Sequence, residues 1–196
     1  MTVRATRREL IVGAAAAAMS GSVAADEAVA DAPAPSDADL LGQSLQVERL
    51  IVLGYRRVFD SGLLAPTIRQ AIAPHLDHEL AHLAALAARL KSLGAPAPIG
   101  PLDDKAAGDV MAQHHVPGSL TGLHTQNDCL KLLVDLESAA EGAHYTALKD
   151  LRDPSLQHLS AQIMSCEAQH WTVLSGLRNP GQYVKAIPWP FVFGTK

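Results

Sequence analysis

Residues 78–82 read HELAH and residues 166–170 read CEAQH, and these two stretches decide how the rest of the sequence is interpreted. Each contains a Glu and a His three positions apart within a segment rich in Ala and Leu. Residues at that spacing lie on one face of a helix. In both segments this is the apolar face, so a carboxylate and an imidazole stand where core leucines would be expected.

The composition favours a helical domain. The chain has 196 residues, only 4% of them aromatic, and period-2 runs of strand-forming residues are hard to find. The net charge is −4, and no run of Lys or Arg occurs beyond the extreme N-terminus, so we expect no nucleic-acid surface. The chain's two cysteines, Cys129 and Cys166, are too few for a disulfide framework or a zinc site. Their expected separation predicts that they form no bond with each other.

The first 24 residues have the form of an export signal. Arg7 and Arg8 precede a short apolar run, and the small residues Ser22 and Ala24 suit cleavage after Ala24 or one residue later. The stretch TRRELIV resembles a twin-arginine signal, with a general secretory signal as the alternative. We therefore expect an exported, periplasmic or extracellular protein handled by the twin-arginine export machinery. If the signal is not cleaved, it could anchor the protein in a membrane.

The rest of the chain divides into a tether, a bundle and a tail. Residues 25–37, rich in Ala, Pro and Asp, should be a disordered linker. Residues 38–178 should form the folded domain, and residues 179–196 an apolar, Pro-rich tail that packs on the bundle or against a partner, including a second copy of the chain.

Apolar positions spaced three and four apart predict four long helices, at about 36–60, 65–93, 119–151 and 154–177. Pro74 should kink or locally break the second helix. The Pro- and Gly-rich residues 94–118 should cross over along the bundle, with a short helical piece near 103–113.

Each long helix carries a glutamate in the middle of its apolar face. Burying ionised carboxylates without partners costs several kcal/mol each. The sequence offers no Lys or Arg at these positions, so cations or protons must neutralise the four carboxylates. Their distances from the predicted turns place them in one layer of the bundle together with two histidines. The set is Glu48, Glu79, His82, Glu137, Glu167 and His170.

The order Glu, ExxH, Glu, ExxH resembles the ligand pattern of the ferritin-like di-iron and di-manganese carboxylate proteins. This resemblance implies an all-α, ferritin-like four-helix bundle of two antiparallel hairpins joined by a long crossover. It also implies two divalent metal ions, Fe or Mn. Glu48, Glu79 and His82 would hold mainly one ion. Glu137, Glu167 and His170 would hold mainly the other, with Glu79 and Glu167 as bridges. The export signal adds a similarity to exported bacterial ferritin-like domain proteins.

Several neighbouring residues leave alternatives open. Glu141 and His144 form a third ExxH, so Glu141 is either an additional ligand or a replacement for Glu137, and His144 contacts a ligand or pairs with Glu141. His75 either hydrogen-bonds a ligand or is partly exposed. Tyr55 either gates the site, or carries a radical, or fills the core. His78 should be on the surface, His114 and His115 should be solvated, and Cys166 should point away from the site.

Two functions follow from these residues. The first is an exported di-metal oxidoreductase in which Fe(II) or Mn(II) reacts with O₂ or peroxide, as a ferroxidase or a peroxide scavenger. The alternative is a non-catalytic envelope or stress-related helical-bundle binding protein that uses its tail as an interface. Iron storage is disfavoured, because nothing in the sequence indicates a cage.

Overall fold

The computed structural model describes residues 34–187, which fold into five α-helices and one short 3-10 helix, with no strand in that range. The long helices are α1 (Asp37–Asp60), α2 (Pro66–Ser92), α4 (Gln126–Asp150) and α5 (Pro154–Arg178). Helix α3 (Asp104–Gln113) lies in the connection from α2 to α4, and η1 (Tyr183–Ala186) follows α5. The expected signal, most of the expected linker and residues 188–196 of the tail lie outside the described residues.

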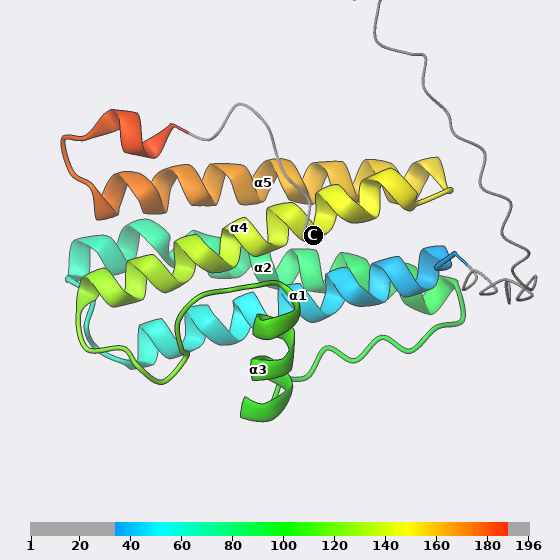
Figure 1. The fold of residues 1–196 in the computed structure, drawn as a ribbon, viewed down its shortest axis with the longest axis horizontal. Helices are drawn as coiled ribbons and strands as arrows, with labels where there is room; N and C mark the ends of the chain where they lie inside the picture. The colour runs from blue at the N-terminus through cyan, green and yellow to red at the C-terminus, as the bar shows by residue number, and fades with distance from the viewer. Residues whose placement is uncertain (1–33, 188–196) are drawn as a thin grey trace, which may run out of the picture. The chain divides into compact units, whose positions relative to one another are not determined.

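The four long helices form two antiparallel hairpins, α1–α2 and α4–α5 (Figure 1). The connection between them begins where α2 ends and runs back along the bundle to the start of α4, with α3 beside α1. The predicted all-α class, the ferritin-like pairing of hairpins and the long crossover are therefore confirmed. Helix α3 also matches the short helical piece expected near residues 103–113.

Local sequence signals set the helix ends. The Ser36 side chain accepts a hydrogen bond from the backbone N–H of Asp39, and the Asp39 carboxylate accepts one from the backbone N–H of Ser36. Asp153 caps α5 with Pro154 in its first turn, as predicted. The expectation that the third long helix starts near residue 119 is wrong, because Thr125 and Asp128 form a second capping box that begins α4 at Gln126.

Helix α2 runs unbroken through Pro74, so the local break that this residue could have caused does not occur. Its last turns bring Arg89 and Lys91 to the C-terminal end, where positive charge is favourable.

The core consists of two apolar clusters on either side of the polar layer. Along α1, Leu41 and Leu45 belong to one cluster and Ile51 to the other, and Glu48 lies between them. Along α5, Ile163 and Leu174 flank the CEAQH segment in the same way. The apolar clusters thus fix the register of the helices that carry the polar residues.

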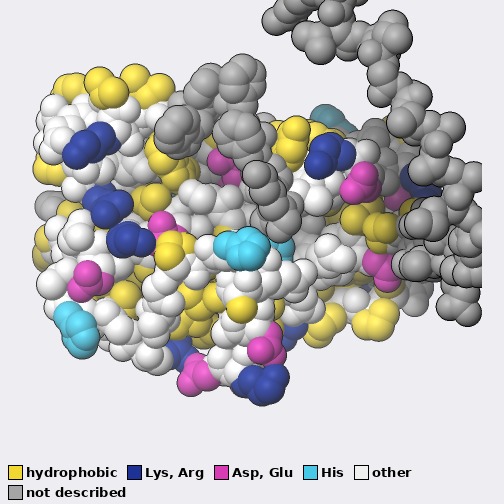
Figure 2. Space-filling view, in the orientation of Figure 1, with side chains coloured by type: hydrophobic (Ala, Val, Ile, Leu, Met, Phe, Trp, Pro, Cys, Tyr) yellow, Lys and Arg dark blue, Asp and Glu magenta, His cyan; other side chains and the backbone are white. Residues whose placement is uncertain are grey.

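The surface combines charged and hydrophobic side chains. On the face in Figure 2, acidic and basic side chains are interspersed, and hydrophobic side chains gather over η1. Tyr183 and Val184 are each 82% exposed there, although η1 contacts α5. Within residues 34–187, none of the helices has the length and apolar character needed to cross a membrane.

Candidate metal centre

The six residues predicted as metal ligands come together inside the bundle. Each long helix contributes one glutamate, and all four glutamates are fully buried. Their carboxylates and the rings of His82 and His170 form two overlapping groups of atoms suited to metal ions. The first group, called site A, consists of Glu48, Glu79, His82 and Glu167. The second group, called site B, consists of Glu79, Glu137, Glu167 and His170.

In each site the imidazole Nδ1 atom lies close to three carboxylate oxygens. In site A, Nδ1 of His82 is 2.9 Å from Oε1 of Glu167, 3.4 Å from Oε2 of Glu79 and 3.7 Å from Oε2 of Glu48. A divalent ion with ligands at about 2.0–2.2 Å separates its donor atoms by about 2.9–4.4 Å. The distances in site A lie within this range.

Site B repeats this geometry with the remaining oxygens. Nδ1 of His170 is 2.8 Å from Oε1 of Glu79, 3.4 Å from Oε2 of Glu137 and 3.5 Å from Oε2 of Glu167. Glu79 and Glu167 thus present one oxygen to each site, whereas Glu48 and Glu137 each face one site only.

Hydrogen bonding divides the glutamates in the same way. Both oxygens of Glu79 and both oxygens of Glu167 are buried without a hydrogen-bond partner. Glu48 and Glu137 each have only one such oxygen, Oε2. Nδ1 of His82 and Nδ1 of His170 are also unpartnered. Because buried polar atoms are nearly always satisfied, these atoms fit ligands that converge on two ions.

Glu48 and Glu137, which each face one site only, are called the outer glutamates. A side chain from the opposite hairpin hydrogen-bonds the remaining oxygen of each. Nε2 of His144 on α4 donates to Oε1 of Glu48 on α1, at 2.8 Å. In return, the Tyr55 hydroxyl on α1 donates to Oε1 of Glu137 on α4. In each helix the ring lies seven residues after the glutamate, which places it on the same face two turns away.

His75 extends the network around site B. Its Nδ1 lies 3.1 Å from the Tyr55 oxygen, and because the single hydroxyl proton goes to Glu137, the Nδ1–H of His75 donates to that oxygen. Its ring also stacks on His170 with centroids 4.2 Å apart. His75 is buried rather than partly exposed. It could also join Glu137 and His170 in holding an ion.

The metal-free site keeps its charges low by holding protons. Burial and the neighbouring Glu137 raise the pKa of Glu79 to about 8, and the same two causes raise the pKa of Glu167 well above its usual value. Burial also acts to raise the pKa of Glu48, but the hydrogen bond from His144 and the proximity of His82 overcome it and lower that pKa to about 2. The raised pKa values favour the protonated forms of Glu79 and Glu167, and the lowered pKa values favour the ionised forms of Glu48 and Glu137.

The histidine ligands balance the outer charges. Burial by itself lowers the pKa of His82 and His170, but the proximity of Cys166 and the glutamates raises it above the usual value. A raised pKa favours the imidazolium form of both rings, so a metal ion that binds at Nδ1 would displace the proton there.

The structure separates the remaining candidates. Glu141 is half-buried and belongs to neither site, and burial raises its pKa. On α4 the geometry thus brings Glu137, and not Glu141, together with the other predicted ligands. His144 is fully buried and contacts Glu48, so the alternative pairing with Glu141 is wrong. His114 is buried in the crossover rather than solvated.

His78, expected on the surface, and Cys166, expected to point away from the site, both lie close to His170. Sγ of Cys166 is 3.5 Å from Nε2 of His170, one turn along α5. His78 is exposed, but its Nδ1 lies 2.9 Å from the same Nε2 atom. Hydrogen bonds with His170 and His82 lower the pKa of the Cys166 thiol to about 6. Both cysteines are free, as predicted.

Sequence reasoning missed two features of the centre. The first is the pair of hydrogen bonds from His144 to Glu48 and from Tyr55 to Glu137, which cross between the hairpins. The equal seven-residue spacing in Glu48–Tyr55 and Glu137–His144 could have indicated them. The second is the contact of Cys166 with His78. It could not be predicted, because the angular position of a residue on one helix does not show how closely a neighbouring helix approaches.

Comparisons with known proteins agree with this geometry. The model of the ferritin-like domain family matches residues 36–180. The crystal structure of a conserved hypothetical protein from Mycobacterium tuberculosis has the same fold, with a TM-score of 0.62 and 18% sequence identity. That match covers 79% of this chain and 96% of the other. A search of curated proteins finds no match. Since the family model covers most of the chain, including all four ligand-bearing helices, the protein belongs to the ferritin-like domain family.

Proposed function

We propose that this protein is an exported di-metal oxidoreductase that binds two Fe(II) or Mn(II) ions and reacts with O₂ or peroxide. One observation carries the proposal: Glu79 and Glu167 each present two unpartnered, buried oxygens, one to each site, while Glu48 and Glu137 present one. Two carboxylates that bridge the ions and two that each bind one ion would present their oxygens in this way.

The donor set favours iron or manganese. Each site combines three carboxylate oxygens with one imidazole nitrogen, and oxygen-rich sets of this kind suit Mn(II) and Fe(II). When bound, the two ions would supply redox chemistry toward O₂ or peroxide. The Cys166 side chain is outside both sets and contacts the far nitrogen of His170 and Nδ1 of His78.

The chain's own residues prepare the site for this chemistry. His144 and Tyr55 fix the outer glutamates by hydrogen bonds to one oxygen, which leaves the second oxygen directed into the site. Glu79 and Glu167 hold protons until metal arrives and release them on binding. The apolar clusters above and below the layer exclude water.

Metal binding tests the proposal directly. The purified full chain is titrated anaerobically with Fe(II) or, separately, with Mn(II), and the bound metal is counted by mass spectrometry. We expect two ions per chain, followed by uptake of O₂ or peroxide and growth of a near-ultraviolet Fe(III) absorption in the iron sample. A chain that binds neither metal at micromolar concentration would refute the proposal.

A matched pair of variants on α4 checks the assignment. Glu137→Gln should reduce the bound metal, because this carboxylate faces site B. Glu141→Gln, one turn further along the same helix, should leave the metal content unchanged. The reverse result would move the α4 ligand to Glu141.

Export is a separate part of the proposal. It is supported by the paired arginines, the short apolar run and the small residues before Ala25. Replacing Arg7 and Arg8 with lysine should retain a fused reporter inside the cell, whereas a general secretory signal would tolerate the change.

A further inference from the structure

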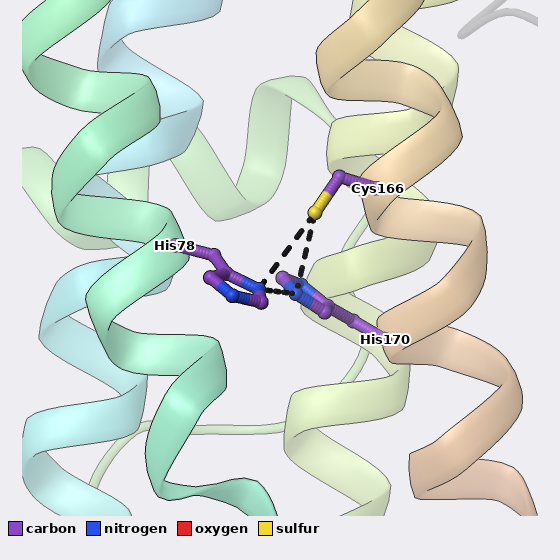
Figure 3. Close-up of side chains that lie close together, drawn as sticks. All are labelled: His78, Cys166 and His170. Atoms are coloured by element: carbon purple, nitrogen blue, oxygen red, sulfur yellow. Dashed lines mark hydrogen bonds between the residues drawn. The ribbon is translucent and has the colours of Figure 1, made fainter.

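A second cluster of metal-ligating side chains lies beside site B. It consists of His78 on α2 with Cys166 and His170 on α5, and the three side chains point toward one another across the gap between the two helices (Figure 3). Nδ1 of His78, Sγ of Cys166 and Nε2 of His170 converge there. Only His170 is shared with the di-metal centre, and it uses its other nitrogen there.

The separations between these atoms match a small thiophilic cation. The two nitrogens are 2.9 Å apart, and Sγ lies 3.5 Å from Nε2 of His170 and 3.9 Å from Nδ1 of His78. A tetrahedral zinc ion, with Zn–N of about 2.0–2.1 Å and Zn–S of about 2.3 Å, separates two nitrogens by about 3.3 Å and nitrogen from sulfur by about 3.5 Å. Adjustments of a few tenths of an ångström bring the three atoms to these values.

Access and donor chemistry both distinguish this cluster from sites A and B. His78 is exposed and Cys166 is half-buried, so an ion can reach the cluster from solvent, whereas the four glutamates are fully buried. The cluster contains no carboxylate, and a thiolate with two imidazoles prefers Zn(II) to the Fe(II) or Mn(II) favoured by oxygen donors.

We propose that His78, Cys166 and His170 form a third metal site that binds Zn(II), with the fourth position open to water. The ion bonds to Nε2 of His170, and Nδ1 of the same ring faces site B. Occupancy therefore fixes the ring in the orientation that site B requires. The zinc site draws on two residues outside sites A and B, His78 and Cys166, and shares only the His170 ring, which binds an ion at each nitrogen when it has released both ring protons to solvent.

Cobalt(II) provides a selective probe, because only a thiolate ligand gives an intense near-ultraviolet charge-transfer band with it. The full chain titrated with Co(II) should develop this band, and added Zn(II) should remove it by displacement. Cys166→Ser should abolish the band, and the matched Cys129→Ser should retain it, since Cys129 is buried against Ser61 instead. A wild-type chain without the band, or a band that persists in Cys166→Ser, overturns the proposal.

Alkylation gives an independent measurement on the unaltered chain. Bound Zn(II) should slow the reaction of Cys166 with iodoacetamide at least tenfold, as followed by peptide mass spectrometry. His78→Asn should remove most of this protection while leaving Cys166 in place. Equal rates with and without Zn(II) would show that His78 and Cys166 only hydrogen-bond His170.

Two variants separate this proposal from the proposed function. Glu48→Gln should lower the Fe(II) or Mn(II) content and leave the cobalt–thiolate band unchanged, because Glu48 contacts neither His78 nor Cys166. Cys166→Ser should show the opposite behaviour. Loss of the band in Glu48→Gln would mean that the three residues do not form a site of their own.

Discussion

Sites A and B share two glutamates but differ in what surrounds them. Around site B, the His170 side chain is 3% exposed, and its ring stacks between those of His75 and His78. Around site A, the His82 side chain is 13% exposed. The outer glutamates differ as well, since Glu48 accepts from an imidazole and Glu137 from a phenol. Two sites with the same ligand types can therefore differ in ion exchange and in affinity.

Substitution of either glutamate shared by the two sites should have the largest effect on metal content. Because Glu79 and Glu167 each present an oxygen to both sites, Glu79→Gln or Glu167→Gln should empty A and B together. The expected result is a fall from two ions per chain to less than half an ion at micromolar metal. Metal analysis after desalting measures it. A variant that retains one full ion would show that the glutamate serves one site only.

Substitution of the outer glutamates, one at a time, should distinguish site A from site B. Glu48→Gln should empty site A and leave B, and Glu137→Gln should do the reverse, so each variant keeps about one ion per chain. Exchange of the remaining ion with a chelator should be slower in Glu48→Gln, because the retained site B is the more enclosed. Equal exchange rates would remove the distinction between the sites.

The side chains that hold the outer glutamates should give a smaller effect. His144→Phe removes the donor to Glu48 and should weaken site A by about 10–100-fold, as is usual for partners of metal ligands. His144→Gln, which keeps a donor, should recover part of the loss. Tyr55→Phe should weaken site B by about tenfold. Calorimetric titration of each variant with Mn(II) measures both affinities.

The pH dependence of stability should show the smallest and most graded effect. In the metal-free chain the pKa of Glu79 rises from 4.5 to about 8, so its contribution to stability is complete below pH 4.5 and is lost as the pH rises toward 8. Glu48 behaves oppositely: its contribution is present above pH 4.5 and is lost as the pH falls toward 2. Thermal unfolding from pH 4.5 to 8 should show a falling midpoint without metal. Saturating Mn(II) should reverse this trend.

The fold could be predicted because its signals are local and repeated. Spacings of three and four, capping residues at Ser36 and Asp153, and the Pro-rich crossover each act over a few residues. The late start of α4 was missed although its signal was equally local, since Thr125 and Asp128 are spaced as a capping box.

The site was predictable in composition but less so in detail. Charge alone requires that four buried glutamates be neutralised, and helix periodicity places two histidines in their layer. Neither argument specifies how closely α2 approaches α5. That approach is what brings His78 and Cys166 into contact. Nor does either argument decide between Glu137 and Glu141, which lie one turn apart on α4. Both questions depend on the rotation of one helix against another, and the packing of the whole core sets that rotation.

The crossed bonds of the outer glutamates also bear on how the protein assembles. Each hairpin carries its own ExxH segment, but Glu48 is oriented by His144 and Glu137 by Tyr55, so neither hairpin can complete a site alone. When the hairpins have not yet docked, each site lacks the shared glutamate from the other hairpin, Glu167 for site A and Glu79 for site B, and also the side chain that orients its outer glutamate. Metal retention by the proposed centre would therefore report that both hairpins have come together in register.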